Sequence, residues 1–391
     1  MGMLDGVVVI EMAQVISGPM CGLLLADLGA DVIKVESPGR GDSFRHWDGG
    51  DGSSVSSSFA AFNRGKRSCA IDTRTRAGKD VYRRLVASAD VVVENFRPGV
   101  LDDAGIGWQA LSELDPRLVY CSISGMGSHG PRAGEPTYDA VAQALSGMWS
   151  QFTDMSRPEP VGPPLADQLT GLYAASGILA ALHERGRTGA GRLLEVSMFG
   201  SCMAFQTLGA SAALIDGAVP DRSSRARSSL SFAFVGADGE PFCVHLSSQQ
   251  KFWELLCRAL GDDELAVDAR FVAKRDRTSR YEELRHALQE RFSRRDRSAW
   301  LAQLQRHGVP ASPIQRLDEA LADPQFDALG LGIPAGPETT PGVRCPIAVD
   351  GSHGWGTRPV PELGASTDDV LAGVGFAEDE LERLRSEGVL R

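Results

Sequence analysis

The 391-residue sequence contains few cysteines and spaces them widely. There are seven, an odd number, and no two of them form a Cys-x-x-Cys pair. Disulfide frameworks and structural zinc sites need paired or closely spaced cysteines, and no His-Glu-x-x-His motif offers another zinc site. We therefore expect free thiols, no metal site and a cytoplasmic location.

Long apolar runs and an excess of basic residues are also missing. No run of about 18 apolar residues occurs, and no basic segment followed by an apolar one stands at the N-terminus. The formal net charge is −11, while the apolar fraction of 42% is ordinary for a globular protein. We expect neither a membrane nor nucleic acid as a partner.

Two common enzyme signatures are absent from the places where they would act. The first strand-to-helix turn, Val15–Pro19, lacks the glycine fingerprint, and its proline removes an N–H that could bind a pyrophosphate. Glu36 ends the second predicted strand like a ribose-binding acid, but without that turn it does not support a nicotinamide dehydrogenase. No Gly-x-Ser-x-Gly elbow occurs, which argues against a serine hydrolase.

Short apolar runs alternate with helix-like segments through the first half of the chain. Val7–Met12 is typical of a strand buried on both faces, Pro19–Leu28 has helical spacing, and Asp31–Glu36 is typical of the next strand. The alternation continues with predicted strands at 68–72, 90–94, 118–124 and 192–198 and predicted helices at 73–89, 138–149 and 199–213. This pattern predicts the α/β class, with a doubly wound, mostly parallel, Rossmann-like sheet.

The composition changes after residue 215, which predicts a second domain. Residues 216–230 are rich in Gly, Pro, Ser and Arg, as expected of a linker. A hairpin is predicted at 231–246, followed by amphipathic helices at 250–260, 280–292, 298–305 and 317–322. We expect a large α/β domain at 1–215, a linker at 216–230, a small α+β domain at 231–325, and a C-terminal segment at 326–391 that returns to the large domain.

One carboxylate stands at a special place in this pattern. Pro163 and Pro164 cannot lie inside a helix, and helical spacing begins directly after them, so Asp167 is predicted at the first turn. There the free N–H groups and the helix dipole favour an ionised carboxylate. Small residues leave one flank of this helix bare for close packing, namely Gly171, Ala174, Ala175, Ser176 and Gly177. Taken alone, the stretch favours a simple capping role for Asp167.

A series of short motifs runs in order along nearly the whole chain. They are Ile16–Pro19, Leu25–Glu36, Gly41–Asp42, Asn63–Arg67, Ala89–Gly99, Pro116–Gly125, Gly130–Pro131, Tyr138–Asp139, Asp167 with Thr170–Gly171, Ala180–Arg185, Thr188–Gly191, Asp238–Gly239, Gly308–Ala311 and Leu363–Gly364. In this order the sequence resembles the class III coenzyme A transferase family, of the CaiB/BaiF type, which contains formyl-CoA:oxalate and carnitine CoA-transferases.

The resemblance implies an architecture that agrees with the pattern above. The family has a large doubly wound domain built from both ends of the chain and a small inserted domain. Two subunits form a homodimer of interlocked rings, and the active site lies where one subunit's large domain meets the partner's small domain.

The resemblance also implies a catalytic role for Asp167. A carboxylate at this position attacks the thioester of a donor acyl-CoA, so that anhydride and aspartyl-CoA thioester intermediates carry CoA to an acceptor acid. The expected partners are thus an acyl-CoA and a small carboxylic acid, with the CoA thioester as substrate and no tightly bound cofactor. Arg74 and Arg97 are the natural phosphate partners. Two basic residues common in the family are missing, because Ser37 stands at the position of one and Asp102-Asp103 lie near the position of the other. The positions that match the family's CoA contacts are Val15, Ile16, Ser17, Ile71, Asp72, Thr73, Arg74, Asn95, Phe96, Arg97, Tyr138 and Asp139.

Two alternatives stay open at this point. The α-methylacyl-CoA racemases share the fold and use the same aspartate as a base opposite a histidine, but position 138, where that histidine is expected, holds Tyr138. A non-catalytic acyl-CoA-binding protein would retain the fold without covalent chemistry. The identity of the donor and acceptor acids is not encoded in any motif.

Overall fold

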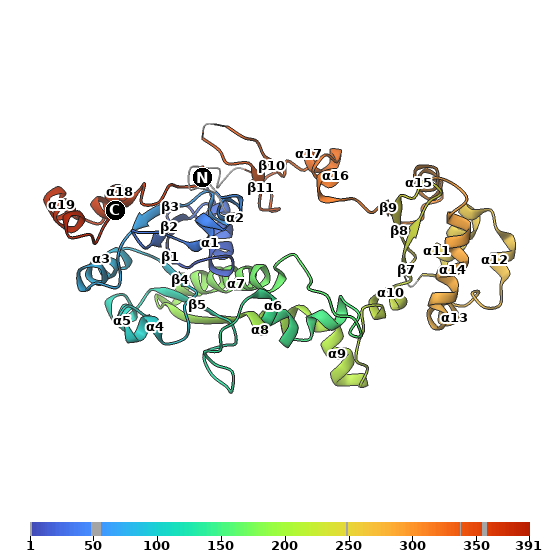
Figure 1. Cartoon of the computed structure of the whole chain (residues 1–391), viewed down its shortest axis with the longest axis horizontal. Helices are drawn as coiled ribbons and strands as arrows, with labels where there is room; N and C mark the ends of the chain where they lie inside the picture. Colours follow the sequence, from blue (N-terminus) through green and yellow to red (C-terminus); the bar gives the residue numbers. More distant parts are fainter. Residues whose placement is uncertain (1, 48–55, 248, 337, 354–357) are drawn as a thin grey trace. The chain divides into compact units, whose positions relative to one another are not determined.

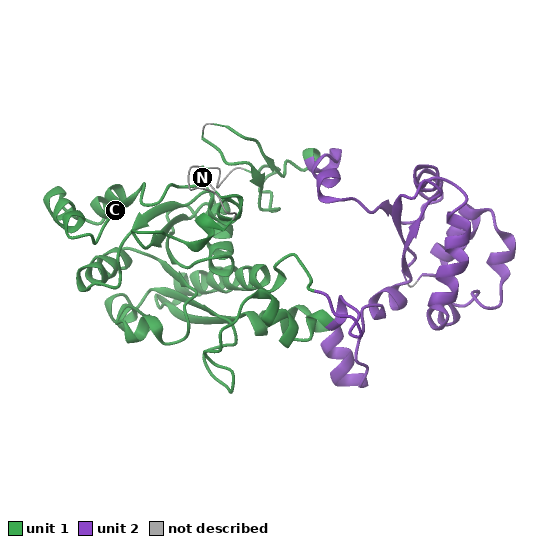
Figure 2. Cartoon of the chain, in the orientation of Figure 1, with its two compact units in different colours: residues 1–149, 160–208, 327–391 green, residues 150–159, 209–326 purple. Residues whose placement is uncertain are grey.

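The computed structural model describes residues 2–47, 56–247, 249–336, 338–353 and 358–391 (Figure 1). Contacts divide the chain into two compact units, coloured separately in Figure 2. The first unit consists of residues 1–149, 160–208 and 327–391, and the second of residues 150–159 and 209–326. Both ends of the chain therefore belong to the first unit.

A six-stranded parallel sheet forms the centre of the first unit. Its strands are β1 (Val8–Met12), β2 (Asp31–Glu36), β3 (Arg67–Ala70), β4 (Val91–Glu94), β5 (Val119–Ser124) and β6 (Arg192–Ser197). They lie in the order β3-β2-β1-β4-β5-β6, and each neighbouring pair is parallel. The predicted α/β class and doubly wound sheet are thus confirmed. The order reverses between β1 and β4, which is where such sheets bind ligands, beyond the carboxyl ends of the strands.

Alternate residues of the strands bury two separate cores. Val9 of β1, Val91 of β4 and Cys121 of β5 face the long helices α1 (Ser17–Asp27) and α7 (Leu165–Thr188). Their neighbours Ile10 and Val92 face the opposite way, onto α3 (Arg76–Val86) and the C-terminal helices α18 (Thr367–Gly373) and α19 (Glu378–Ser386). Figure 1 shows the two layers on either side of the sheet.

Shorter elements complete the first unit. They are α2 (Ser57–Asn63), α4 (Val100–Asp103), α5 (Trp108–Leu114), α6 (Asp139–Leu145), α8 (Met198–Phe205), β10 (Gly332–Ile333), β11 (Gly342–Val343) and the 3-10 turn Ser43–His46. A second 3-10 turn, Met148–Gln151, crosses into the second unit.

The second unit contains the predicted hairpin, β7 (Ser231–Val235) with β8 (Pro241–His245), which β9 (Ala311–Pro313) extends to three antiparallel strands. Phe234, Phe242, Phe292 and Trp300 pack ring against ring beneath it. The other helices of this unit are α9 (Thr207–Asp216), α10 (Ser224–Ser229), α11 (Gln250–Leu260), α12 (Asp263–Val267), α13 (Lys274–Ser279), α14 (Tyr281–Phe292), α15 (Arg297–Arg306), α16 (Leu317–Leu321) and α17 (Pro324–Ala328). The first and the last of them, α9 and α17, span the boundaries between the units.

The expectation of a single buried helix over 199–213 is wrong. The segment forms two helices, α8 and α9, and the side-chain amide of Gln206 donates to the carbonyls of Cys202 and Ser146 at the break. No residue of α9 is buried. Its apolar residues indicated a core position, but they lie on the surface.

By length and apolar composition, α7 could cross a membrane, as could α8 and α9 if taken together across their break. α7 is a core helix here, because Ala174 and Ile178 are buried in the same cluster as residues of the sheet.

Candidate active site

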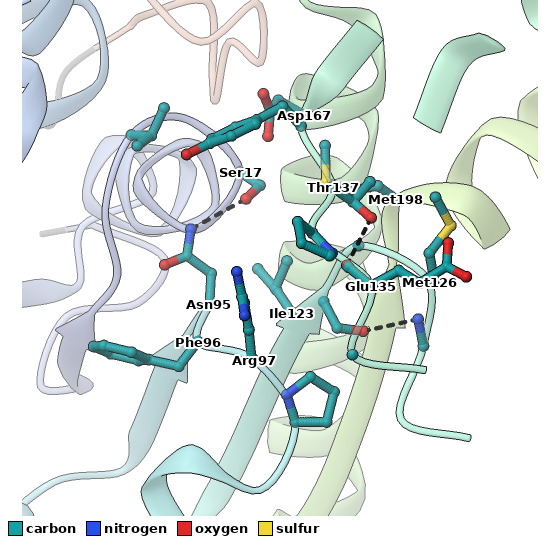
Figure 3. Close-up of a pocket in the computed structure, with 18 of the residues that line it drawn as sticks. Ser17, Asn95, Phe96, Arg97, Ile123, Met126, Glu135, Thr137, Asp167 and Met198 are labelled. Atoms are coloured by element: carbon teal, nitrogen blue, oxygen red, sulfur yellow. Dashed lines mark hydrogen bonds between the residues drawn. The ribbon is translucent and has the colours of Figure 1, made fainter. Parts of the chain in front are cut away.

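A cavity of about 340 Å³ opens beyond the carboxyl ends of β1, β4 and β5 (Figure 3). Asp167 and six of the predicted CoA-contact positions line it. These six are Val15, Ser17, Asn95, Phe96, Arg97 and Tyr138. The structure therefore brings the predicted nucleophile and half of the predicted contacts to the point where the strand order reverses.

Asp167 is the third residue of α7 and is only 8% exposed. Burial, and then the negative charge of Asp139, raise the pKa of its carboxyl to about 7, although the hydroxyl and backbone N–H of Ser17 act in the opposite direction. The sequence predicted an ionised carboxylate held by the helix N-terminus. In this structure burial outweighs that effect, so near neutral pH the group is present in both forms.

Asp139 explains why the N-terminus of α7 does not hold Asp167 ionised. Its Oδ1 accepts the backbone N–H groups of Ala166 (2.8 Å) and Asp167 (3.2 Å), and its Oδ2 accepts from Gln143 (2.6 Å). The free donors of α7 are thus used by a neighbouring carboxylate. Asp139 does not line the cavity, so the structure gives it a capping position behind Asp167.

Ser17 is the first residue of α1, lines the same cavity as Asp167, and favours the ionised form of that carboxyl. Its Oγ accepts a hydrogen bond from Asn95 Nδ2 at 3.3 Å, as Figure 3 shows. Because the oxygen accepts from Asn95, the hydroxyl proton is free to be donated to Asp167. Asn95 also holds the backbone of Gln14, through Oδ1 to the N–H (2.9 Å) and through Nδ2 to the carbonyl (2.8 Å).

Close packing of α1 on α7 brings Ser17 to Asp167. A Cβ added at Gly171, one turn after Asp167, would lie 2.7 Å from Met20 Cβ and 2.8 Å from Ser17 O. Only glycine allows this approach. The prediction that the small residues of α7 leave a flank for close packing is confirmed.

A second cavity, of about 240 Å³, adjoins the first, since Gln14 and Phe96 line both. The predicted contacts Ile71, Asp72, Thr73 and Arg74 line it. The guanidinium of Arg74 is paired with Asp72 at 2.8 and 2.9 Å. Ile16 is buried beside the first cavity and lines neither.

Arg97 is the cation of the first cavity (Figure 3). Among the described residues its guanidinium has no carboxylate partner, so it can bind an anionic group of a ligand. No group of three His, Cys, Asp or Glu side chains suited to a metal ion gathers in the described parts of the chain.

Sequence reasoning missed several residues of the cavity wall. Glu135 and Thr137 come from the loop after β5, and Met198 directly follows β6. Their positions after the carboxyl ends of parallel strands were the available signal. The irregular loop gave no periodic pattern from which to choose them.

Comparison with solved structures identifies the class of fold to which the first unit belongs. A solved structure described as a CAIB/BAIF family protein from Brucella suis matches with a TM-score of 0.83 and 37% identity, over 95% of this chain and 99% of that one. The six-stranded α/β unit is therefore a CaiB/BaiF fold.

The family follows from the sequence comparisons. The profile described as "CoA-transferase family III" matches residues 4–367, so the chain belongs to CoA-transferase family III. Relatives include succinate–glutarate CoA-transferase from Agrobacterium fabrum, 36% identical over 94% of this chain and 95% of that protein. Acetyl-CoA:oxalate CoA-transferase from Acetobacter aceti is 35% identical over 93% of both chains.

Proposed function

We propose that this enzyme transfers CoA from an acyl-CoA donor to a carboxylic acid acceptor, with Asp167 as the covalent nucleophile. The observation that carries the proposal is the position of Asp167, a buried carboxylate in the wall of a cavity beyond the parallel strands, which Ser17 at the start of α1 also lines. The family membership supports the reaction class.

The reaction proceeds through four exchanges at acyl carbons. The Asp167 carboxylate attacks the donor thioester, the C–S bond breaks, and CoA thiolate leaves an acyl-aspartyl anhydride. The thiolate then attacks the aspartyl carbonyl and releases the donor acid. The acceptor carboxylate displaces CoA from the aspartyl thioester to form a second anhydride. Attack of the thiolate on the acceptor's acyl carbon yields the new acyl-CoA and restores Asp167.

The site has features that these steps need. Anhydrides hydrolyse readily, and the burial of Asp167 limits access of water to them. The N–H and hydroxyl of Ser17 stabilise the carboxylate form that attacks. The unpaired guanidinium of Arg97 and the second cavity, with Arg74, suit the phosphates of CoA.

The proposal also includes the class of substrate, the assembly of the subunits and the location in the cell. The relatives are named for dicarboxylic acids such as succinate, glutarate and oxalate, which supports a small dicarboxylate as one partner here. An interlocked homodimer is supported by α9, whose Leu208, Leu214 and Ile215 are 72%, 87% and 80% exposed and would be covered by a second subunit. The seven cysteines are all free, which supports a cytoplasmic location.

Covalent trapping tests the proposal. The protein is incubated separately with acetyl-, succinyl-, glutaryl- and oxalyl-CoA, quenched with hydroxylamine and mapped by peptide mass spectrometry. An aspartyl hydroxamate on Asp167 with at least one donor is expected, and none with Asp167→Asn. A hydroxamate on another carboxylate, with Asp167 unmodified, would overturn the assignment.

The racemase alternative makes a different prediction in the same samples. Tyr138 is 75% exposed, and no histidine is among the described residues that line the cavity, so the histidine that a racemase would place opposite Asp167 is not among them. Deuterium wash-in at Cα of a 2-methylacyl-CoA without hydroxamate would support the racemase. Tight binding of acyl-CoA with neither signal would support a non-catalytic binding protein.

A further inference from the structure

The loop that carries Ser17 contains a strained residue. Val15 has φ of 67°, in the left-handed region that β-branched residues rarely adopt. Such a conformation persists only where the surroundings enforce it, and it occurs mostly at functional sites. Val15 lies two residues before Ser17, so its conformation sets where α1 begins.

Side chains from three other elements hold this loop by its backbone. Both carboxylate oxygens of Asp42 accept the N–H of Val15, at 3.2 and 3.3 Å. Lys34 donates to the carbonyl of Ala13 at 2.7 Å and pairs with Asp42 at 2.9 Å. Asn95 fixes both backbone groups of Gln14 between them.

The charges beneath the loop are buried and balanced. Glu11, Lys34, Asp42 and Lys66 are each at most 2% exposed. Lys34 bonds Glu11 and Asp42, and Lys66 bonds Glu11 at 2.7 Å and the carbonyl of Pro19 at 2.9 Å. Buried ion pairs contribute little net stability, because desolvation offsets their attraction. Stability therefore does not account for this cluster, whereas the fixing of a defined backbone geometry does.

Asp42 remains ionised in this environment. Burial alone would raise the pKa of its carboxyl, but Lys34 and the N–H groups of Phe44 and Val15 outweigh burial and lower it. Burial would likewise lower the pKa of Lys34, but Glu11 and Asp42 outweigh it and raise it. The Asp42 carboxylate therefore keeps its hydrogen bonds to the N–H of Val15 at pH values around neutrality.

We propose that Asp42, supported by Lys34, is a positioning residue that keeps Val15 in its left-handed conformation and so directs the hydroxyl and N–H of Ser17 at Asp167. The inference rests on the proposed role of Asp167 as nucleophile. If Val15 relaxed to an ordinary negative φ, the chain would turn by roughly 120° about one bond, and Ser17 would leave Asp167.

A displacement of Ser17 would change the ionisation of the Asp167 carboxyl. The groups that act on it are Asp139 from α6, the Cys202 thiol from α8 and Ser17 from α1, with Arg97 in the wall of the same cavity. Ser17 is the one that favours the ionised form of Asp167. Loss of its contacts leaves less of the attacking carboxylate at neutral pH.

The test measures the rate of acyl transfer to Asp167 between pH 5 and pH 9, trapped as the hydroxamate. Asp42→Asn is expected to shift the midpoint of the pH profile upward and to slow the reaction at pH 6 about three- to tenfold, since each pH unit changes the ionised fraction up to tenfold. Should this variant fail to fold, Asp42→Glu can be used instead, because it displaces the carboxylate oxygens by one methylene and retains the charge. It is also expected to shift the midpoint upward and to slow the reaction at pH 6.

Two double variants that include Asp42→Asn distinguish a positioning role of Asp42 from a general loss of structure. Val15→Gly in the Asp42→Asn background is expected to restore much of the rate, because glycine adopts positive φ without strain. In a Ser17→Ala background, Asp42→Asn is expected to add almost nothing, since two residues that act through one path are not additive.

Asp27→Asn is the matched control. Asp27 is a buried carboxylate paired with Arg64 outside both cavities. The Asp27→Asn variant is expected to lower the melting temperature and to leave the midpoint of the pH profile unchanged. The inference is overturned if Asp42→Asn behaves in the same way, or if its effect adds fully to that of Ser17→Ala. Absence of hydroxamate from the wild-type protein with every donor would instead overturn the proposed function.

Discussion

Asp167 is held between opposing influences, and their balance sets its chemistry. Burial and Asp139 favour the neutral form, while Ser17 favours the ionised form, with the pKa at about 7. A carboxylate this basic is a stronger nucleophile than an exposed aspartate, but only part of it is ionised at neutral pH. A compromise between reactivity and abundance is typical of catalytic groups.

The pH dependence of acylation follows from that pKa. Below pH 7 the ionised fraction of Asp167 falls about tenfold per unit, so hydroxamate formation should rise with pH and level off above about 7. Asp139→Asn retains an oxygen for the N–H groups of Ala166 and Asp167 but removes the negative charge. It should move the midpoint downward and raise the rate at pH 6 about three- to tenfold. Rapid-quench measurements would check this, and an unmoved midpoint would contradict it.

The same pKa predicts that the ionised form of Asp167, the proposed nucleophile, lowers the stability of the folded protein. The carboxyl takes up a proton on folding between about pH 4, the unfolded pKa, and about pH 7, so its contribution to stability is present at low pH and lost as pH rises through 7. Asp167→Asn should therefore be more stable than the wild type at pH 8, by at most about 4 kcal/mol. The difference should vanish toward pH 4. Urea unfolding at the two pH values measures it, and a difference independent of pH would count against the burial argument.

At the scale of elements, the site depends on how closely two helices pack. α1 and α7 meet where Gly171 leaves no side chain between them, and this contact places the start of α1 against the start of α7. Two helix N-termini thus meet at one carboxylate.

Gly171→Ala should separate the helices. The added methyl would lie within 2.8 Å of Ser17 O and Met20 Cβ, so α1 must move. We expect destabilisation of about 1–3 kcal/mol and a loss of acylation of at least about tenfold. Gly177→Ala is the matched control on the same helix, since its methyl meets only Leu194 at 3.5 Å and should stabilise α7 by about 1 kcal/mol. Thermal unfolding and hydroxamate yield distinguish the two, and equal behaviour would refute the packing argument.

Elements with a local signal were predicted well, and those fixed by distant partners were not. β2 was predicted at its observed bounds, Asp31–Glu36, because a buried parallel strand is a continuous apolar run. Asp167 was found because it belongs to a motif at a helix start. The hold of Asp42 on Val15 was not predictable, since the two are 27 residues apart and no periodicity records their contact. The break at Gln206 was missed because apolar content alone does not distinguish a buried helix from an exposed one.

At the scale of the whole molecule, α9 exposes large apolar side chains that no other part of the described chain covers. Leu214 and Ile215 are at least 80% exposed, which is unusual for such residues unless a second surface meets them. This is the structural support for the proposed homodimer.

Assembly offers the test of that dimer. The variant Leu214→Lys with Ile215→Lys should yield at least about tenfold less dimer after refolding from denaturant, because buried interface anchors each contribute more than about 1 kcal/mol. Val267→Lys, at an exposed valine of α12, is the control and should leave assembly unchanged. Sedimentation velocity measures the dimer fraction. A wild-type protein that sediments as a monomer would contradict the proposal.

The placement of α18 and α19 has a consequence for biosynthesis. These helices supply Val370, Leu371, Leu381 and Leu384 to the core beneath β1, β2 and β4, which they share with α3, so this face of the sheet is fully covered only after they have been translated. At 5–20 residues per second, the ribosome reaches them roughly 20–70 s after β1 has emerged. During that interval Ile10, Ile33 and Val92 lack part of their covering layer, so we expect a nascent chain without α18 and α19 to aggregate more readily than one that includes them.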